Sequence, residues 1–231
     1  MPAKLLKLQA RTDYVDEVYK VLLDAISEGS IAPGTRIVQE EIAEQLAVSR
    51  SPVLQAFRML KKDGLVEDAP GRGLQVTPLD AERIGHLYEL RGALDGLAAR
   101  LAAKKRTKID KSLIATGRRV SKGDDIRAMI EADMAFHIAI YTASGNPLIL
   151  ENARLHWLHL RRVMGAVHQV AGQRKTVWDE HAAIAEAIFQ GDEELAARLS
   201  LQHTEFAREN LVRHMAQAVG TVDGTQQSAR R

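Results

Sequence analysis

The chain has 231 residues, 45% of them hydrophobic and 27% charged, and this ordinary globular composition excludes a disordered chain, a collagen-like fibre and a mucin-like stalk. A formal net charge of +2 is too small to indicate a partner, and without cysteine any metal must be held by histidine, carboxylate or backbone oxygen. We expect a cytoplasmic protein with no membrane partner, because no stretch approaches ~20 consecutive apolar residues and residues 1–10 lack the apolar core of a signal peptide.

The N-terminal part, which we place at residues 10–78, contains the strand and turn signals of the chain. Apolar residues three and four apart predict a first helix that Gly29 ends, and a Pro33-Gly34 turn follows it. Ser49 or Ser51 is expected to cap a later helix, with Gly64 just after its end. In chain order the predicted elements are a helix over 13–28, an extended piece over 36–38, helices over 39–46 and 49–63, and strands over 65–68 and 73–77.

This order of elements is typical of a winged helix-turn-helix, in which the second of two crossed helices enters a major groove and the hairpin reaches the flanking backbone. Arg50, Arg58, Lys61 and Lys62 add positive charge to that helix, and Arg72 adds it to the hairpin tip. Helix-turn-helix geometry also occurs in proteins that do not bind DNA. Lys61 and Lys62 could also be a solvated helix end. Acidic residues elsewhere in the first 79 positions largely cancel the basic ones, so the basic patch is local and the domain as a whole is not strongly basic.

Every segment after residue 79 is helical in pattern, which predicts a mostly α fold with an antiparallel six-helix bundle over residues 79–219. The polar residues 220–231 are expected to form a disordered tail. The predicted helices span 80–104, 109–120, 124–143, 148–168, 176–190 and 193–219. The first of them carries a long amphipathic stripe made of Ile84, Leu87, Leu90, Leu94, Leu97 and Leu101.

A candidate metal site is spread over the third, fifth and sixth of these helices. Asp133 and His137 are four residues apart, so they share one helix face. One carboxylate and three imidazoles suit Zn, Ni, Mn or Fe. His156 and His159 also lie at helical spacing, and a lone helical histidine is more often a core or surface residue than a ligand, so periodicity does not choose among the histidines. The candidate ligands are Asp133, His137, His181 and His203.

Three N-terminal segments resemble, in this order, the DNA-binding domain of GntR-family bacterial transcriptional regulators: PGTRI at 33–37, EIAEQLAVSRSPV at 41–53 and LKKDGLV at 60–66. The chain departs from that family at Leu54, where an arginine usually follows Pro-Val. Leucine cannot make a bidentate contact to guanine, so operator sequence or affinity is expected to differ. The resemblance implies operator contacts from Arg36, Ser49, Arg50, Ser51, Gly71, Arg72 and Gly73.

The C-terminal part resembles the ligand-sensing FCD domain of the FadR branch of that family, through YELR at 88–91, DMAFHI at 133–138, SGNPL at 144–148 and EHAAI at 180–184. This resemblance selects the four candidate ligands over His156 and His159. It implies a divalent metal, with Zn first and Ni, Mn or Fe left open, and a small carboxylate or sugar-acid effector. Arg91 suits a carboxylate clamp, and Asn146 is a second pocket candidate. The alternatives are an ion pair of Arg91 with a surface glutamate and capping of the fourth helix by Asn146.

Taken together, the sequence predicts a DNA-binding transcriptional regulator without enzymatic activity. We expect it to bind a two-fold double-stranded DNA operator as a homodimer under the control of the effector. One alternative is a metal-dependent hydrolase with an attached DNA-binding domain, since open metal positions could activate water. The sequence offers that hydrolase neither an obvious general base nor an H-E-x-x-H motif. The other alternative is a dedicated metal sensor.

Overall fold

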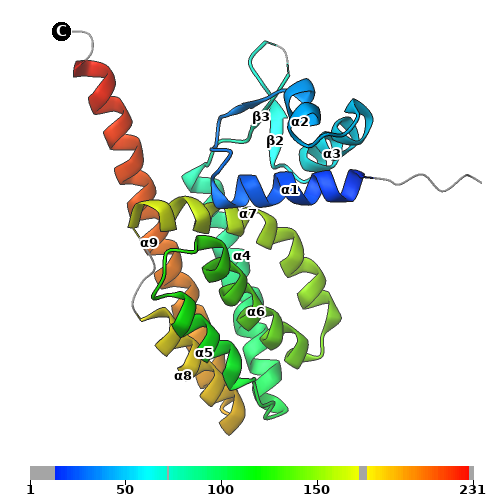
Figure 1. Ribbon diagram of the computed structural model, residues 1–231. Helices are drawn as coiled ribbons and strands as arrows, with labels where there is room; N and C mark the ends of the chain where they lie inside the picture. The colour runs from blue at the N-terminus through cyan, green and yellow to red at the C-terminus, as the bar shows by residue number, and fades with distance from the viewer. Residues whose placement is uncertain (1–13, 72, 172–175, 229–231) are drawn as a thin grey trace, which may run out of the picture. The chain divides into compact units, whose positions relative to one another are not determined.

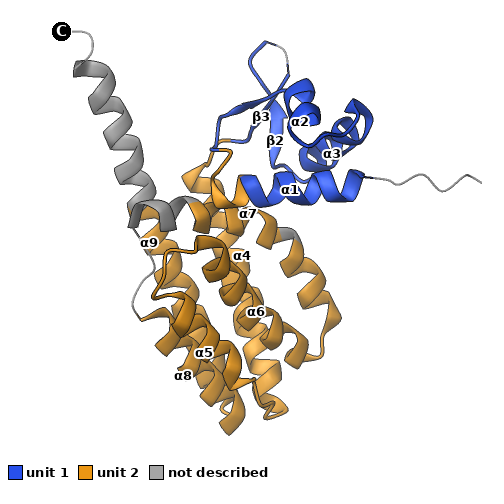
Figure 2. Cartoon of the chain, viewed as in Figure 1, with its two compact units in different colours: residues 1–25, 32–77 blue, residues 26–31, 78–231 orange. Residues whose placement is uncertain are grey.

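The computed structural model describes residues 14–71, 73–171 and 176–228, and the chain divides into two compact units (Figures 1 and 2). Unit 1 contains residues 1–25 and 32–77, and unit 2 contains residues 26–31 and 78–231. The fold is mostly α with one small sheet, as the sequence predicted. Within the described ranges, no helix combines the length and the apolar character that crossing a membrane would require.

Unit 1 has the predicted elements of a winged helix-turn-helix. Val53, Phe57 and Leu60 are buried on the inner side of the second helix of the motif, as the spacing predicted. The extended piece before the motif is a short strand that pairs with the hairpin, giving a three-stranded antiparallel sheet of order β1-β3-β2. The elements are α1 (Val15–Glu28), β1 (Arg36–Ile37), α2 (Gln39–Gln45), α3 (Arg50–Lys62), β2 (Val66–Asp68) and β3 (Leu74–Val76).

Unit 2 contains the six predicted helices. Aspartates at their N-termini define several starts: Asp80 Oδ1, for example, accepts a hydrogen bond of 2.9 Å from the Glu82 N–H. Gly145 and Gly191 end two of the helices in the left-handed region, with φ of 70° and 77°. The helices are α4 (Ala81–Lys104), α5 (Lys111–Val120), α6 (Ile126–Ser144), α7 (Pro147–Ala171), α8 (Val177–Gln190) and α9 (Glu193–Ser228).

The C-terminal end of the last helix differs from the prediction. The sequence predicted an end near Val219 and a disordered tail over 220–231, whereas α9 continues to Ser228. The physical reason is that no proline follows Val219, so nothing in the chain removes a helical N–H or forces the backbone out of the α region. Residues 229–231 lie outside the described ranges.

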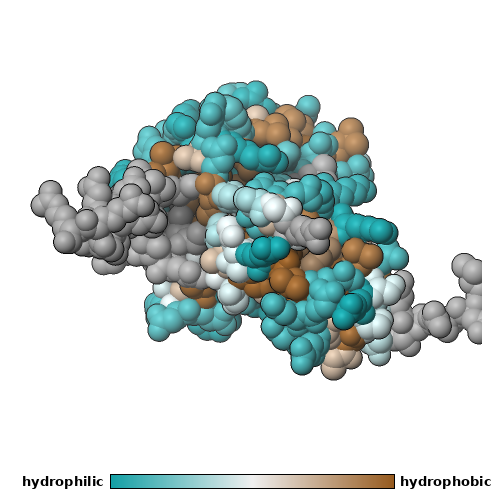
Figure 3. All heavy atoms as spheres, turned by 90° about the horizontal axis from the view of Figure 1, so that it is seen from above, coloured by the Kyte–Doolittle hydropathy of each residue, from teal (hydrophilic) through white to brown (hydrophobic). Residues whose placement is uncertain are grey.

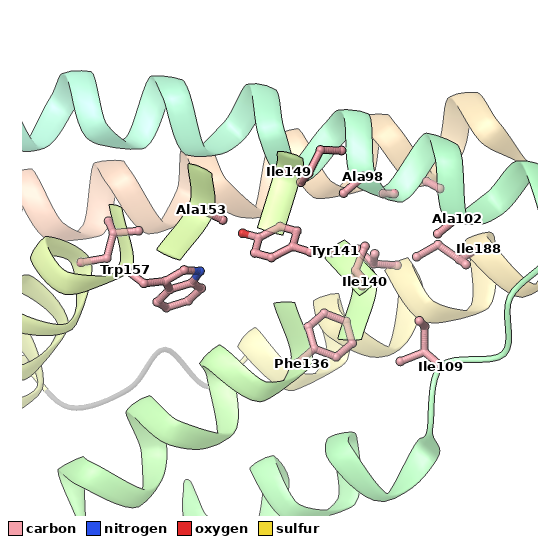
Figure 4. Packing of buried hydrophobic residues seen from close by; sticks show 14 of the residues in the cluster. Ala98, Ala102, Ile109, Phe136, Ile140, Tyr141, Ile149, Ala153, Trp157 and Ile188 are labelled. Atoms are coloured by element: carbon pink, nitrogen blue, oxygen red, sulfur yellow. The ribbon is translucent and has the colours of Figure 1, made fainter. Parts of the chain in front are cut away.

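The leucine stripe of α4 also differs from the prediction. An amphipathic pattern normally places its apolar stripe against the core, but part of this stripe is exposed to solvent. Leu90 and Leu97 are each 45% exposed, and α4 instead faces the bundle with small residues such as Ala98 and Ala102 (Figure 4). The cause is the close approach of α9. A Cβ at Gly96 would lie 3.2 Å from Leu201 Cγ and 3.6 Å from the Ala197 carbonyl oxygen, so a larger residue there would require the Leu201 side chain to shift by a few tenths of an ångström.

The core of unit 2 lies between α4, α6, α7 and α8. Phe136, Ile140 and Tyr141 of α6 point into it, and Trp157 reaches it from α7 (Figure 4). The face seen in Figure 3 is by contrast mostly hydrophilic, with apolar side chains in small separate groups. Several charged and polar side chains are nevertheless buried with this core, and buried charges are rare unless they are paired: Arg91, Asp95, Asp133, His137, His181, His203 and Thr204.

Candidate metal centre and DNA-binding surface

The structure brings together the four predicted ligands from α6, α8 and α9. All four are buried, and each offers one ligand atom such that these atoms lie within 4.8 Å of one another. His156 and His159, the other histidine pair at helical spacing, are not part of this group. The four residues, which we call the donor group, are Asp133, His137, His181 and His203.

The spacing of the donor atoms suits a single divalent ion. His181 Nε2 lies 3.2 Å from His203 Nε2 and 3.5 Å from Asp133 Oδ1. His137 Nε2 lies 3.8 Å from Asp133 Oδ2. Donors bound tetrahedrally to one ion at about 2.0–2.2 Å are about 3.3–3.6 Å apart, so these separations are close to the required ones, and the four donor atoms, which lie within 4.8 Å of one another, would draw together around the ion. Three imidazoles and a carboxylate are also the ligand types that Zn, Ni, Mn and Fe accept.

The surroundings of His137 favour the neutral imidazole that a metal needs. Burial lowers the pKa of His137 well below its usual value, and the positive charge of Arg91 lowers it further, followed by His181 and His203. A neutral ring keeps a lone pair for coordination, whereas a protonated ring has none to give. The Phe136 ring stacks on His181 with the ring centroids 4.2 Å apart, which fixes the plane of that imidazole.

A carboxylate outside the donor group holds His203. Glu180 Oε2 lies 2.9 Å from His203 Nδ1, so Nδ1–H can donate to Glu180 while Nε2 faces His181. Such a contact fixes the tautomer and raises the basicity of a metal-binding histidine. Spacing along the chain does not indicate this role, because the two residues are 23 positions apart on different helices and only the packing of α8 on α9 brings them together.

Removing this carboxylate should weaken metal binding without unfolding the site. We expect Glu180→Ala to lower metal affinity by about 10–100-fold, the usual effect of losing an outer partner of a ligating histidine. Competition with a chromophoric chelator measures the change. Glu186→Ala is the matched control, since Glu186 is an exposed glutamate of α8 that bonds to Gln190. Equal affinities for the two variants would contradict the role of Glu180.

Arg91 lies inside the bundle beside the donor group. Its Nη2 donates to His137 Nε2 at 2.7 Å and lies 3.7 Å from Asp133 Oδ2, and its guanidinium lies 4.7 Å above the Trp157 ring centre. Although burial lowers the pKa of Arg91, the carboxylates of Asp95 and Asp133 raise it, so the net shift is upward and the side chain stays charged. The alternative of a surface ion pair is therefore wrong. The guanidinium supplies the donor group with positive charge, as a bound ion would.

Asp95 fixes the position of this arginine. Its Oδ2 accepts hydrogen bonds of 3.2 Å from Arg91 Nε and from Thr204 Oγ1, and its Oδ1 accepts from the Tyr141 hydroxyl. Burial, followed by the charge of Asp95, raises the pKa of Tyr141 well above its usual value, so the hydroxyl remains a donor. One carboxylate thus connects α4, α6 and α9, a role that spacing along the chain does not indicate.

Asn146 lies at the start of α7. Its Oδ1 accepts a hydrogen bond of 3.1 Å from the Leu148 N–H, and its own N–H donates to Ser144 Oγ at 3.1 Å. This geometry is that of a helix cap. It favours the capping alternative, and a contact of Asn146 with an effector stays a prediction.

The start of α3 presents the predicted DNA-contacting residues to solvent. Ser49 is the N-cap residue, without a capping bond from its own side chain, and Ser51 is exposed. The side chain of Arg50 is 69% exposed and lies 3.2 Å from Glu40, an exposed pair that phosphate can replace. Leu54 is 40% exposed on the same helix, so an apolar side chain is available where the resemblance would place arginine.

The hairpin between β2 and β3 lies next to Arg36. Gly71 and Gly73 have φ of 95° and 98°, a region that favours glycine, and they form the turn. A Cβ at Gly73 would lie 3.4 Å from Arg36 Nε, so the arginine passes directly over this glycine. Arg72 lies outside the described residues. Two of the residues predicted to contact DNA, Arg36 and Gly73, therefore lie side by side at the hairpin.

Comparison with known proteins is consistent with both units. Residues 14–76 match the family "Bacterial regulatory proteins, gntR family", and residues 86–206 match the FCD domain. The uncharacterized HTH-type transcriptional regulator YdhC of Bacillus subtilis is 29% identical over 89% of this chain and 94% of its own length. The probable D-xylose utilization operon transcriptional repressor of Paenarthrobacter nicotinovorans is 27% identical over 85% of this chain and 88% of its own. The structure of McbR/YncC from E. coli shares the fold, with a TM-score of 0.76, 19% identity and coverage of 89% of this chain and 100% of that one.

Proposed function

This chain belongs to the gntR family of bacterial transcriptional regulators and carries an FCD domain, and we propose that a small carboxylate or sugar acid, bound at a metal held by the donor group, sets its affinity for operator DNA. Zn is the first choice of metal, followed by Ni, Mn and Fe. With four protein donors in place, a bound ion would act as a Lewis acid and would take an anionic oxygen as an added ligand, as zinc does when it expands from four to five.

The observation that carries this proposal is the buried Arg91 beside the donor group. A guanidinium pairs with a carboxylate in a bidentate manner, and here the Arg91 Nη2 already lies 2.7 Å from a donor nitrogen. Asp95 accepts a hydrogen bond from the Nε edge of the Arg91 guanidinium, and the Nη2 edge therefore faces the donor group. Because an ion would take the lone pair of that His137 nitrogen, the Nη2 edge would be released from it, and an anion that reached this spot would meet the arginine and the metal together. The name of the Paenarthrobacter relative refers to D-xylose utilization, which supports an effector derived from a sugar without indicating the acid group.

On the DNA side, we propose that residues 10–78 read the operator and that residues 79–219 sense the effector. A homodimer with two DNA-binding domains fits a two-fold operator, because one recognition helix contacts only a few base pairs. Binding of the effector would change the distance between the two DNA-binding domains of the dimer through the junction at residues 77–80. The protein would act in the cytoplasm, where the DNA is. The proposed operator contacts are Arg36, Ser49, Arg50, Ser51, Gly71, Arg72 and Gly73.

Operator binding at fixed salt tests this proposal. Metal-loaded protein is titrated onto a fluorescent operator with lactate, malate or gluconate as probes, and at least one probe should change the dissociation constant by about 5-fold or more, the lower end of ordinary coupling. Arg91→Gln should abolish that response. If no probe changes the affinity, the effector proposal fails. If removal of the metal alone changes it to the same extent, the chain is the metal sensor of the second alternative.

Loss of Arg50 should weaken specific DNA binding. We expect Arg50→Ala to cost about 1–3 kcal/mol of operator affinity, the usual effect of removing a base- or phosphate-contacting arginine at a recognition helix. Metal content should not change, because Arg50 lies in unit 1. Arg119→Ala, an exposed arginine of α5, is the matched control. Unchanged operator affinity in the Arg50 variant would remove α3 from its assigned role.

A further inference from the structure

Two helices of unit 2, α5 and α8, lie side by side and leave a groove of about 570 Å³ between them (Figure 1). A volume of this size is typical of sites that bind small molecules. Each helix lines the groove with residues at positions i, i+3, i+4 and i+7, which form one helix face. On α5 these residues are Lys111, Ile114, Ala115 and Arg118. On α8 they are Ala182, Ala185, Glu186 and Phe189, and we call the space between the two faces the α5–α8 groove.

The sizes of the side chains explain why the two helices leave this space. They touch at one end, where a Cβ added at Gly117 would overlap the Trp178 ring. Farther along, the facing residues include three small ones: Ala115, Ala182 and Ala185. Alanine is too short to fill the space between two helices, so the groove stays open there. Phe189 is 48% exposed beside it and adds apolar surface.

Two lysines near the start of α5 are placed to bind an anion in the groove. Lys108 and Lys111 line it, and both are exposed. Within the described ranges of the chain, neither lysine forms a hydrogen bond or an ion pair with another side chain. Asp110 lies between them in the sequence, but it is the N-cap of α5 and its Oδ1 accepts a hydrogen bond of 2.9 Å from the Ser112 N–H.

The other charges at the groove are already paired. Arg118 Nη2 lies 2.6 Å from Asp179 Oδ1. Among the described residues, Glu186 is the one carboxylate that lines the groove, and it accepts a hydrogen bond of 2.6 Å from Gln190. The two lysines therefore leave the lining with an excess of positive charge beside an apolar surface.

The basic residues that precede Lys108 have structural contacts of their own. Lys105 Nζ donates to the Ser144 carbonyl oxygen at 2.8 Å, at the end of α6. The Arg106 side chain covers Gly191 at the end of α8, where a Cβ would lie 2.7 Å from Arg106 Nε. Cations are stabilising at helix C-termini, which accounts for these two residues. Lys108 has no such contact, so its place at the groove calls for a different explanation.

The size and the charge of the groove indicate its occupant. A protein partner usually covers about 20–30 residues, far more than line this groove, so the size favours a small molecule. The segments of the chain outside the described ranges, 1–13, 72, 172–175 and 229–231, each carry a net positive charge and do not complement the lysines. A ligand from outside the chain with an anionic group does.

We propose that the α5–α8 groove binds a small amphipathic anion. Its apolar body, of about the size of two fused rings, lies between the alanines and Phe189, and its carboxylate or sulfonate group pairs with Lys108 and Lys111. This site is distinct from the donor group, because the groove lies on the exposed side of α8 whereas His181 is fully buried. The inference goes beyond the proposed function and requires neither metal nor DNA.

Isothermal titration calorimetry of the full-length protein tests this site. The anionic probes are 2-naphthoate and naphthalene-2-sulfonate, and 2-naphthamide is a neutral analogue of the first. At least one anion should bind with a Kd below about 1 mM, which ligands of this size reach at ordinary efficiency. The amide should bind at least about 10-fold more weakly, because it forms no charge-assisted hydrogen bonds with the lysines. If neither anion binds, or if the amide binds equally well, the proposal fails.

The lysines are tested with a matched pair of double variants. Lys108→Gln with Lys111→Gln should weaken binding of the anion by about 10-fold and leave binding of the amide unchanged. Lys104→Gln with Lys122→Gln, which changes two exposed lysines that do not line the groove, is the control and should bind as wild type does. Equal affinity of the two double variants for the anion would remove the lysines from the site.

A filled groove locates the apolar part of the ligand. Ala185→Trp places a large ring in the space and should abolish binding of the anion, whereas Ala183→Trp, at an exposed alanine of the same helix, should retain it. Undiminished binding in the Ala185 variant would place the probe elsewhere and overturn the proposal. Light scattering should give the same oligomeric state for this variant and wild type, and a change would identify the groove as a contact between copies of the chain instead. Metal affinity should be unchanged in both variants, so this site can fail while the metal-bound effector site holds, and the reverse.

Discussion

Asp95→Ala is expected to destabilise unit 2 by about 3–5 kcal/mol, because removing one partner of a buried ion pair leaves the other charge uncompensated. Arg91 would lose the acceptor of its Nε–H, and Tyr141 and Thr204 would each lose an acceptor as well. Urea unfolding followed by tryptophan fluorescence measures the effect. Both tryptophans of the chain, Trp157 and Trp178, are buried in unit 2, so the signal reports that unit alone.

A double variant separates the ion pair from a general packing defect. Replacing Arg91 by methionine together with Asp95→Ala removes both charges, and in metal-loaded protein, where the ion would compensate Asp133, most of the lost stability should return, since a buried pair exchanged for apolar groups is often neutral. Glu89→Ala on the exposed side of α4 is the control and should stay within about 0.5 kcal/mol of wild type. A loss below about 1 kcal/mol for Asp95→Ala would show that solvent reaches Arg91 in solution.

His181→Ala is expected to lower metal affinity by at least about 100-fold. Loss of a residue that only holds a ligating histidine costs about 10–100-fold, and here a ligand itself is removed. His181 is fully buried and lies within 3.5 Å of both His203 Nε2 and Asp133 Oδ1, so the remaining donors cannot close around the gap. Metal content after dialysis and chelator competition measure the loss. Metal should also cease to raise the unfolding midpoint, since stabilisation by a ligand follows its affinity.

The control for this variant is His156→Ala. His156 lies on α7, outside the donor group, and was the other candidate by spacing. It should retain metal, and both variants should retain non-specific DNA binding, because that depends on unit 1. Metal bound equally well by the two variants would remove His181 from the donor group.

The sequence by itself determined the order and the approximate bounds of the elements. Turn residues such as Gly29 and Gly64 and the spacing of apolar residues are local signals, and the winged helix-turn-helix and the six later helices follow from them. The four members of the donor group came from the resemblance, because helical spacing supports His156 and His159 as well as it supports Asp133 and His137.

Only the tertiary structure decided which side of α4 is inside. Periodicity shows which residues share a face, and it identifies the core face only when that face is the more apolar one. Here α9 approaches so closely that Gly96 and its small neighbours line the core, and Leu90 and Leu97 are left outside. The sequence could not predict the partners of Arg91 and His203 either. Arg91 contacts His137, which lies 46 positions away, and His203 contacts Glu180, which lies 23 positions away. Spacing along one helix carries no information on contacts between helices, and those contacts depend on how side chains of different size fill the space between them.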